Sequence, residues 1–215
     1  MIFLNANREP IKNFDREAEI NEMVELVYNT VMRICPEEFR QTVEENKRSL
    51  AFLVFDKKRK FTRVINGEQS VEKCDAGACA ILDNIVQNDE QLSCTMTIVL
   101  HPNATRHQII HELFHTFSSQ LQRVGNLDIS KVGARISKEN RLNHMEETFG
   151  EELNEGITEA LTNFVEGQRT DRSAYYPHDT QVAAGLIGEN IENNEFLKKV
   201  YFGEAETDQA TKSPR

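Results

Sequence analysis

Blocks of hydrophobic residues recur along the chain, and the spacing inside each block predicts the local structure. Residues 20–34 carry hydrophobic positions at helical spacing up to a following proline, and residues 37–47 predict a short polar helix. Two hydrophobic segments follow at residues 50–55 and 61–65, and we expect them to be the paired strands of a hairpin. The charged run at residues 56–60 would be the solvated tip of that hairpin.

The middle of the chain predicts a strand that leads into a helix. β-Branched residues dominate residues 95–100, which is typical of a strand. Thr105 and Gln108 then have the spacing of a helix capping box. Hydrophobic residues at helical spacing continue from there and predict a helix over about residues 105–121.

Three other segments have weaker patterns. Residues 66–94 leave the secondary structure open, with one candidate strand at residues 78–82. Residues 122–148 are polar, and we expect them to be irregular, with local structure left open from Ile129 to Ile136. The polar residues 203–215 are expected to form a disordered tail.

Two further helices are predicted in the last third of the chain. The first covers about residues 151–166 and is followed by Gly167, a residue suited to end a helix. Gly156 inside it is a poor helix former, which has a use if another backbone or a substrate must come close. The second helix contains the hydrophobic residues of 182–187 and follows the segment Tyr175-Tyr-Pro-His178.

The helix at residues 105–121 contains the sequence His-Glu-Leu-Phe-His, an H-E-x-x-H motif. Residues four apart lie on one face of a helix, so His111 and His115 can direct ring nitrogens at one metal ion. Glu112 lies beside them and could reach a water molecule at that ion. Two imidazoles and a nearby carboxylate are what zinc-assisted hydrolysis needs. His107 extends the same stripe by one turn, but we expect it to be exposed rather than a ligand.

The helix at residues 151–166 contains a pair of glutamates four residues apart. Glu155 and Glu159 share a face that borders the hydrophobic stripe, where an unpaired carboxylate would be costly. A metal ion and a histidine N–H would satisfy the two carboxylates. An acidic, solvated helix is the alternative interpretation, and the neighbouring H-E-x-x-H helix favours the metal.

An H-E-x-x-H motif followed by an N-E-x-x-[ST]-[DE] motif on a second helix resembles the gluzincin metallopeptidases, the thermolysin-like branch of the zincins. The resemblance rests on residues 111–115 and 154–159, and it covers residues 95–167, about a third of the chain. It implies an α+β, zincin-like fold with a small mixed sheet, an active-site helix and a second helix that supplies the third ligand. The downstream histidine and the edge-strand motif of thermolysin have no counterpart in this sequence.

The resemblance also implies a role for each residue of the two motifs. His111, His115 and Glu155 would bind one Zn²⁺ per chain. Glu112 would be the general base that activates water, and Glu159 would orient a ligand histidine.

Zincins often supply a residue after the third ligand to stabilise the oxyanion formed when water attacks a carbonyl. The segment from Tyr175 to His178 could provide this donor. We rank Tyr176 first, then His178 and Tyr175, because Pro177 would fix the directions of its neighbours. The alternative is an aromatic turn packed on the core.

Composition restricts the remaining choices. The net charge of −10 argues against a nucleic-acid-binding or anionic-membrane surface. We see no signal peptide and no hydrophobic stretch of the roughly 20 residues that span a bilayer, so we expect a cytoplasmic protein. The four cysteines would then be free thiols.

The sequence therefore predicts a zinc metallopeptidase that acts on a peptide or protein. It would form a single domain over residues 1–202, in one or two lobes, with a cleft between about residues 121 and 150. Two other functions remain open. One is a catalytically inactive zincin-fold binding or regulatory module, which would have no need for Glu112, and the other is a zinc hydrolase of a non-peptide amide.

Overall fold

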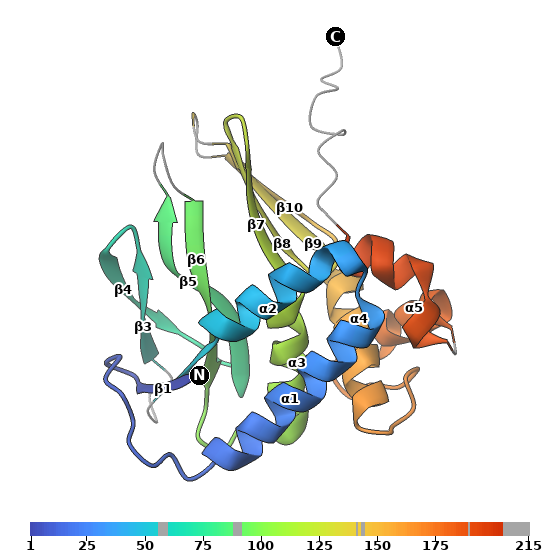
Figure 1. The fold of residues 1–215 in the computed structure, drawn as a ribbon, viewed down its shortest axis with the longest axis horizontal. Helices are drawn as coiled ribbons and strands as arrows, with labels where there is room; N and C mark the ends of the chain where they lie inside the picture. Colours follow the sequence, from blue (N-terminus) through green and yellow to red (C-terminus); the bar gives the residue numbers. More distant parts are fainter. Residues whose placement is uncertain (56–59, 88–91, 141, 143–144, 189, 204–215) are drawn as a thin grey trace.

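The computed structural model describes residues 1–55, 60–87, 92–140, 142, 145–188 and 190–203. Over these residues the chain has an α+β fold, as the sequence predicts. A six-stranded sheet lies on the left of Figure 1, the helices lie in front and on the right, and a four-stranded sheet rises between them. The expected tail beyond Gly203 and most of the charged run at residues 56–60 lie outside the described residues.

Five α-helices are described: α1 (Glu17–Ile34), α2 (Arg40–Ser49), α3 (Arg106–Phe117), α4 (Glu151–Val165) and α5 (Pro177–Ile187). Short helical turns cover Glu37–Phe39 and Ile191–Asn193, and a π-helical turn covers Leu197–Tyr201. The strands are β1 (Ile2–Asn5), β2 (Ala51–Val54), β3 (Lys60–Ile65), β4 (Glu68–Lys73), β5 (Ala78–Gln87), β6 (Leu92–Leu100), β7 (Ser119–Val124), β8 (Leu127–Val132), β9 (Arg135–Asn140) and β10 (Met145–Phe149). The predicted helices near residues 20–34, 37–47, 151–166 and 182–187 are thereby confirmed.

The six-stranded sheet is mixed. Its strand order is β1-β2-β6-β5-β3-β4. Strands β1, β2 and β6 run parallel, and β5 runs antiparallel to β6. The expected strand at residues 78–82 is the first half of the longer strand β5. The expected strand at residues 95–100 is the second part of the longer strand β6.

The predicted hairpin between residues 50–55 and 61–65 is wrong. Strand β2 pairs in parallel with β1 and β6, whereas β3 pairs antiparallel with β4. The reason is the turn at Asn66–Gly67, where both residues have positive φ angles, 49° and 80°. An Asn-Gly pair with this geometry closes a two-residue hairpin, so β3 pairs with the strand that follows it.

The prediction of an irregular segment at residues 122–148 is also wrong. Strands β7 to β10 form an antiparallel sheet in sequence order. The turns after β7 and β8 begin with Gly125 and Gly133, whose φ angles are +60° and +56°. Glycine at the first position of a two-residue turn favours hairpin formation. Polar residues inside this sheet, such as the Arg123–Asp128 ion pair at 2.7 Å, conceal the hydrophobic alternation that usually signals strands.

The main hydrophobic core lies between the helices and the six-stranded sheet. Val27 and Val31 of α1 belong to one buried cluster with Phe52 of β2, Ile98 of β6 and Phe114 of α3. Complete burial of such a side chain contributes about 1.5–3 kcal/mol. Helix α3 contacts α1, α4, β5 and β6, and these contacts fix the direction of its polar face.

Helix α3 is shorter than the predicted span of residues 105–121. It ends at Phe117, and strand β7 starts two residues later at Ser119. The Ser118 hydroxyl donates to the Phe114 carbonyl at 2.8 Å, and the Ser119 hydroxyl donates to the His115 carbonyl at 2.7 Å. These bonds satisfy carbonyl groups of the last turn and allow the helix to stop there.

Helix α4 packs against α5 at Gly156. A Cβ atom at this position would overlap the carbonyl oxygen of Asp179, so the glycine permits the close backbone approach that its place in a helix suggests. Gly167, with φ of +68°, donates its N–H to the Phe164 carbonyl and ends the helical segment, as predicted.

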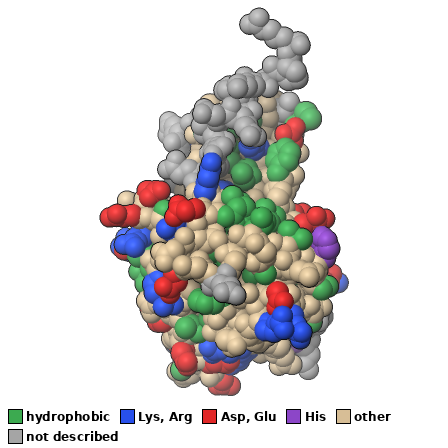
Figure 2. Space-filling view, turned by 90° about the vertical axis from the view of Figure 1, so that its right-hand side faces the viewer, with side chains coloured by type: hydrophobic (Ala, Val, Ile, Leu, Met, Phe, Trp, Pro, Cys, Tyr) green, Lys and Arg blue, Asp and Glu red, His purple; other side chains and the backbone are tan. Residues whose placement is uncertain are grey.

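Helix α5 leaves hydrophobic side chains at the surface. Val182 and Leu186 are 47% and 46% exposed. Figure 2 views the molecule from the right-hand side of Figure 1 and shows hydrophobic side chains among acidic and basic ones on this face. Among the described residues, no helix combines the length and hydrophobicity required to cross a bilayer.

Candidate metal centre

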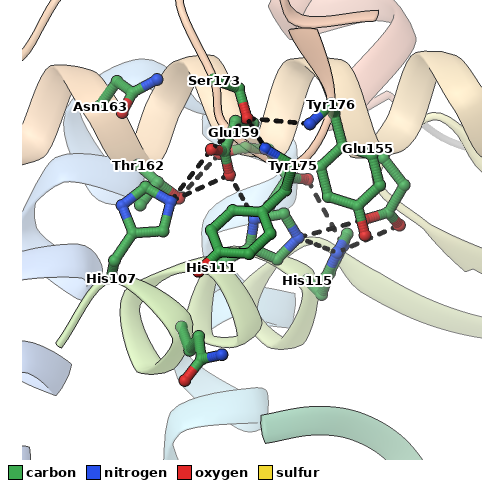
Figure 3. Close-up of polar contacts among 12 residues, drawn as sticks. His107, His111, His115, Glu155, Glu159, Thr162, Asn163, Ser173, Tyr175 and Tyr176 are labelled. Carbon is green, nitrogen blue, oxygen red and sulfur yellow. Dashed lines mark hydrogen bonds and ion pairs between the residues drawn. The ribbon is translucent and has the colours of Figure 1, made fainter. Parts of the chain in front are cut away.

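The H-E-x-x-H motif lies on α3, and that helix begins at the predicted capping box. Thr105 Oγ1 accepts a hydrogen bond from the Gln108 N–H at 3.2 Å, and Gln108 Oε1 accepts one from the Thr105 N–H at 3.0 Å. One and two turns further on, His111 and His115 point toward α4 (Figure 3). Both are buried, with 7% and 6% of their surface exposed.

Three donor atoms converge between α3 and α4. His111 Nε2 lies 3.0 Å from His115 Nε2 and 3.1 Å from Glu155 Oε2, and His115 Nε2 lies 3.4 Å from Glu155 Oε1. Atoms about 2.05 Å from a tetrahedral zinc ion are about 3.3 Å apart. We call His111, His115 and Glu155 the donor cluster. Among the described residues, these three side chains are the group of potential metal ligands that lie close enough together to hold one ion.

The hydrogen bonds at the far side of each ring bear on which nitrogen is free to bind a metal. His111 Nδ1 lies 3.1 Å from Glu159 Oε2, and because a carboxylate only accepts, Nδ1 carries the proton. His115 Nδ1 lies 3.2 Å from Asn154 Nδ2, an amide nitrogen that can only donate, because Asn154 Oδ1 accepts a hydrogen bond from the Ala134 N–H. His115 Nδ1 is therefore an acceptor, and the Thr158 hydroxyl lies further away, at 3.4 Å. In the metal-free structure a proton therefore lies on His115 Nε2, and a metal ion would have to displace it to bind there. Glu159 holds His111 in the orientation that directs its Nε2 into the donor cluster.

The carboxylates also control the charge of the metal-free centre. Burial lowers the pKa of His111, but hydrogen bonds to Glu155 and Glu159 outweigh burial and raise this pKa to about 10. Burial raises the pKa of both carboxyls, yet their hydrogen bonds to histidine hold the two pKa values well below the usual range. A metal ion would therefore displace a proton from His111 when it binds.

Glu112 contacts the six-stranded sheet. Its Oε2 atom accepts a hydrogen bond from the N–H of Ala80, on β5, at 2.7 Å. Burial raises the pKa of Glu112, and the neighbouring histidines and this hydrogen bond only partly offset the effect. A carboxyl with a raised pKa is better suited to take a proton near neutral pH.

Tyr176 reaches the donor cluster. Its ring lies nearly parallel to the ring of His111 at a centroid distance of 6.0 Å. Its hydroxyl lies beside the Glu155 carboxylate (Figure 3). Burial and the charges of Glu155 and Glu112 raise the pKa of Tyr176 to about 12, so the phenol remains a donor at neutral pH.

The two other residues expected near the cleft lie further out. Tyr175 is 64% exposed, and its ring stacks on His107 at a centroid distance of 6.3 Å. His178 is exposed and contacts Asp179 Oδ1 at 3.3 Å. Tyr176 is thus the member of this segment that the fold brings to the donor cluster.

The prediction that His107 is an exposed side chain is wrong. Its Nδ1 lies 2.7 Å from Glu166 Oε2, and its Nε2 lies 3.1 Å from both oxygens of Glu159. The residue lies one turn before His111 and faces α4 in the same way (Figure 3). Glu159 therefore joins two histidines, and Ser173 Oγ donates to its Oε1 atom at 2.7 Å.

Three of these supporting residues were not predicted from the sequence. Asn154 and Thr158 immediately precede Glu155 and Glu159, so they have the same four-residue spacing and face α3 as a second stripe. That spacing is a signal that could have identified them. Ser173 follows α4 in a loop, and no local pattern marks its contact with Glu159.

Comparison of the chain with models of protein families, with curated proteins and with solved structures found no match.

Replacement of Glu159 with alanine is expected to weaken zinc binding without abolishing it. The carboxylate fixes the ring of His111 but is not one of the three converging donors. Loss of a partner of this kind typically reduces metal affinity about 10- to 100-fold. Competition with a fluorescent zinc chelator would measure the change. Unchanged affinity would contradict the orienting role.

The same carboxyl should make the metal-free protein sensitive to acid. Because hydrogen bonds hold the pKa of Glu159 below its usual value of about 4.3, the unfolded chain takes up this proton first as the pH falls. The stabilisation is full above about pH 4.3 and is lost toward the lower pKa of the folded state. Glu159→Gln should thus lower the melting temperature clearly at pH 7 and by less near pH 3.5. An equal difference at both pH values would contradict this.

Proposed function

We propose that this protein is a zinc-dependent metallopeptidase with a zincin-like domain. The observation that carries the proposal is the convergence of His111 Nε2, His115 Nε2 and the Glu155 carboxylate. The two nitrogens lie 3.0 Å apart, and each lies 3.1–3.4 Å from one of the two carboxylate oxygens. Three protein ligands that leave one tetrahedral position open are the pattern of catalytic rather than structural zinc sites.

The donor set also suits zinc chemically. Two neutral imidazoles and one carboxylate match the His₂Glu type of catalytic site. A bound Zn²⁺ would supply Lewis acidity, which polarises a carbonyl group and lowers the pKa of water to about 7. Glu159 would keep His111 in the tautomer and orientation required for binding.

Glu112 would act as the general base. It would take a proton from the attacking water and pass it to the leaving nitrogen of the amide. Its raised pKa favours both transfers, because the carboxyl can then hold the proton briefly at neutral pH. This property supports an enzyme over an inactive binding module, which has no use for such a base.

The arrangement of elements supports the fold assignment. Strand β5 runs antiparallel to β6 and contacts the H-E-x-x-H helix through Ala80 and Glu112. Helix α4 carries the remaining donor on the other side of α3. A mixed sheet, an active-site helix and a second ligand helix are the parts of a zincin-like domain that the two motifs imply.

A combined metal and activity measurement would test the proposed function. Purified protein should contain close to one zinc per chain and should cleave members of a broad peptide library. A chelator should abolish cleavage, and added Zn²⁺ should restore it. Stoichiometric zinc without cleavage of peptides or of simple amides would favour the inactive binding module, and cleavage of non-peptide amides alone would identify the other alternative.

Replacement of Tyr176 with phenylalanine is expected to lower kcat while zinc content stays the same. The change removes only the hydroxyl, which lies at Glu155 and could turn to an oxyanion in the transition state. Loss of one such donor typically costs about 100- to 1,000-fold in kcat. Tyr175→Phe is the matched control, because Tyr175 is exposed and packs on His107. Equal rates for both variants and the wild type would assign Tyr176 a packing role only.

A further inference from the structure

Two cysteine side chains meet at the junction of β4 and β5. Cys74 directly follows β4, and Cys79 is the second residue of β5. The Cys79 S–H donates to Cys74 Sγ at 2.8 Å, whereas non-bonded heavy atoms usually settle about 3.5–4.0 Å apart. None of the four cysteines forms a disulfide in this structure. The two sulfur atoms nevertheless need to approach by less than about 1 Å to reach the bonding distance of a disulfide.

We propose that Cys74 and Cys79 form an intramolecular disulfide when the protein meets a soluble disulfide such as oxidised glutathione. This modification site is independent of the proposed peptidase activity, since neither cysteine belongs to the donor cluster.

The chemistry is a pair of thiol–disulfide exchanges. The Cys79 thiolate attacks one sulfur of oxidised glutathione, forms a mixed disulfide and releases one reduced glutathione. The Cys74 thiolate then attacks Cys79 Sγ, forms the internal disulfide and releases the second reduced glutathione. The two cysteines together lose two protons and two electrons, and the two glutathione sulfurs accept them.

The accessibility of the two residues supports this order of attack. Cys79 is partly exposed, while Cys74 is buried with 5% of its surface exposed. An external disulfide can therefore reach Cys79 first. Cys74 lies in a small hydrophobic cluster with Leu53, Phe55 and Val99, which holds its sulfur beside Cys79.

The loop between the cysteines is already anchored before any oxidation. The Gly77 carbonyl accepts a hydrogen bond from the His101 N–H at 2.9 Å. The side chain of Gln108 packs so closely over Gly77 that a Cβ atom there would overlap it. Closure of the disulfide thus requires little rearrangement, because the backbone on both sides of the bond stays in place.

The bond would stiffen the strand that touches Glu112. Cys79 immediately precedes Ala80, whose N–H donates to Glu112 Oε2 at 2.7 Å. A cross-link over a loop of this size typically stabilises a fold by restricting the unfolded chain. For a protein of this length, the oxidised form is expected to melt about 4–8 °C above the reduced form.

The test is a labelling experiment on the full chain. Protein would be incubated with oxidised or with reduced glutathione near pH 8.5, because a hydrogen bond to Cys74 and burial raise the pKa of the Cys79 thiol and slow its reaction at neutral pH. Free thiols would be blocked with one reagent in denaturant, and disulfides would then be reduced and labelled with a second reagent. Mass spectrometry would assign each label.

In the oxidised sample, Cys74 and Cys79 should carry the second label, while Cys35 and Cys94 carry the first. Cys94→Ser is the matched control and should leave this pattern unchanged, since Cys94 is partly exposed like Cys79. Cys79→Ser should return Cys74 to the first label. The first label on Cys74 and Cys79 in oxidised wild-type protein would overturn the proposal, and so would mixed or intermolecular disulfides as the final products. Either result leaves the metal centre untested, so the two proposals can fail separately.

Discussion

Replacement of His111, His115 or Glu155 with alanine is expected to remove most of the zinc from the purified protein. Each side chain supplies one of three converging donors, and three protein ligands are the minimum in catalytic zinc sites. Residues that only orient a ligand typically account for 10- to 100-fold in affinity, so loss of a ligand should cost more than about 100-fold. Metal analysis by mass spectrometry, with zinc-chelator competition for the affinity, would measure the loss.

Neighbouring glutamates provide the controls for this prediction. Glu151 and Glu152 lie on the exposed first turn of α4, and their alanine variants should keep a full complement of zinc. If Glu155→Ala kept its zinc while Glu147→Ala, Glu151→Ala or Glu152→Ala lost it, the third ligand would be misassigned. Full zinc in both histidine variants would exclude the metal centre altogether.

Replacement of Glu112 with glutamine is expected to leave zinc content unchanged and to lower kcat about 100- to 10,000-fold, the span typical of general acid–base catalysis. Glutamine keeps the size of the side chain and can still accept the hydrogen bond from the Ala80 N–H. It cannot take the proton from water. Single-turnover measurements on a cleaved peptide would separate this loss from any change in substrate binding.

Glu166→Gln is a useful control for Glu112→Gln. Glu166 bonds His107, which is not a member of the donor cluster, so its carboxylate lies further from the proposed metal than Glu112 does. Its replacement should therefore change the rate much less. A rate for Glu112→Gln close to that of the wild type would show that Glu112 is not the base.

Local sequence patterns predict the pairing of strands that are neighbours in the chain, but not the pairing of distant strands. Asn66–Gly67 and the glycines at positions 125 and 133 are local signals, and each closes a hairpin between neighbouring strands. The parallel pairing of β2 with β1 and β6 joins residues far apart in the chain. Such pairing depends on which hydrophobic faces pack together, and no turn residue specifies it.

Local sequence patterns predict the helices and the side chains that share a face of each one. Four-residue spacing places His111 and His115 on one face of α3, and Glu155 and Glu159 on one face of α4, because the helix repeats every 3.6 residues. Capping by Thr105 is equally local. These features follow from hydrogen bonds and side-chain directions within a few residues.

How these helix faces meet depends on the packing of the whole fold. The packing of α3 against α4 brings the Glu155 oxygens within 3.1–3.4 Å of two imidazoles, and it makes His107 a partner of Glu159 rather than a solvated side chain. The loop after α4 places the Tyr176 ring beside His111 of the donor cluster, whereas Tyr175 and His178 remain exposed. Contacts of this kind join elements more than 40 residues apart, so they depend on the free energy of packing the whole core and not on any local preference.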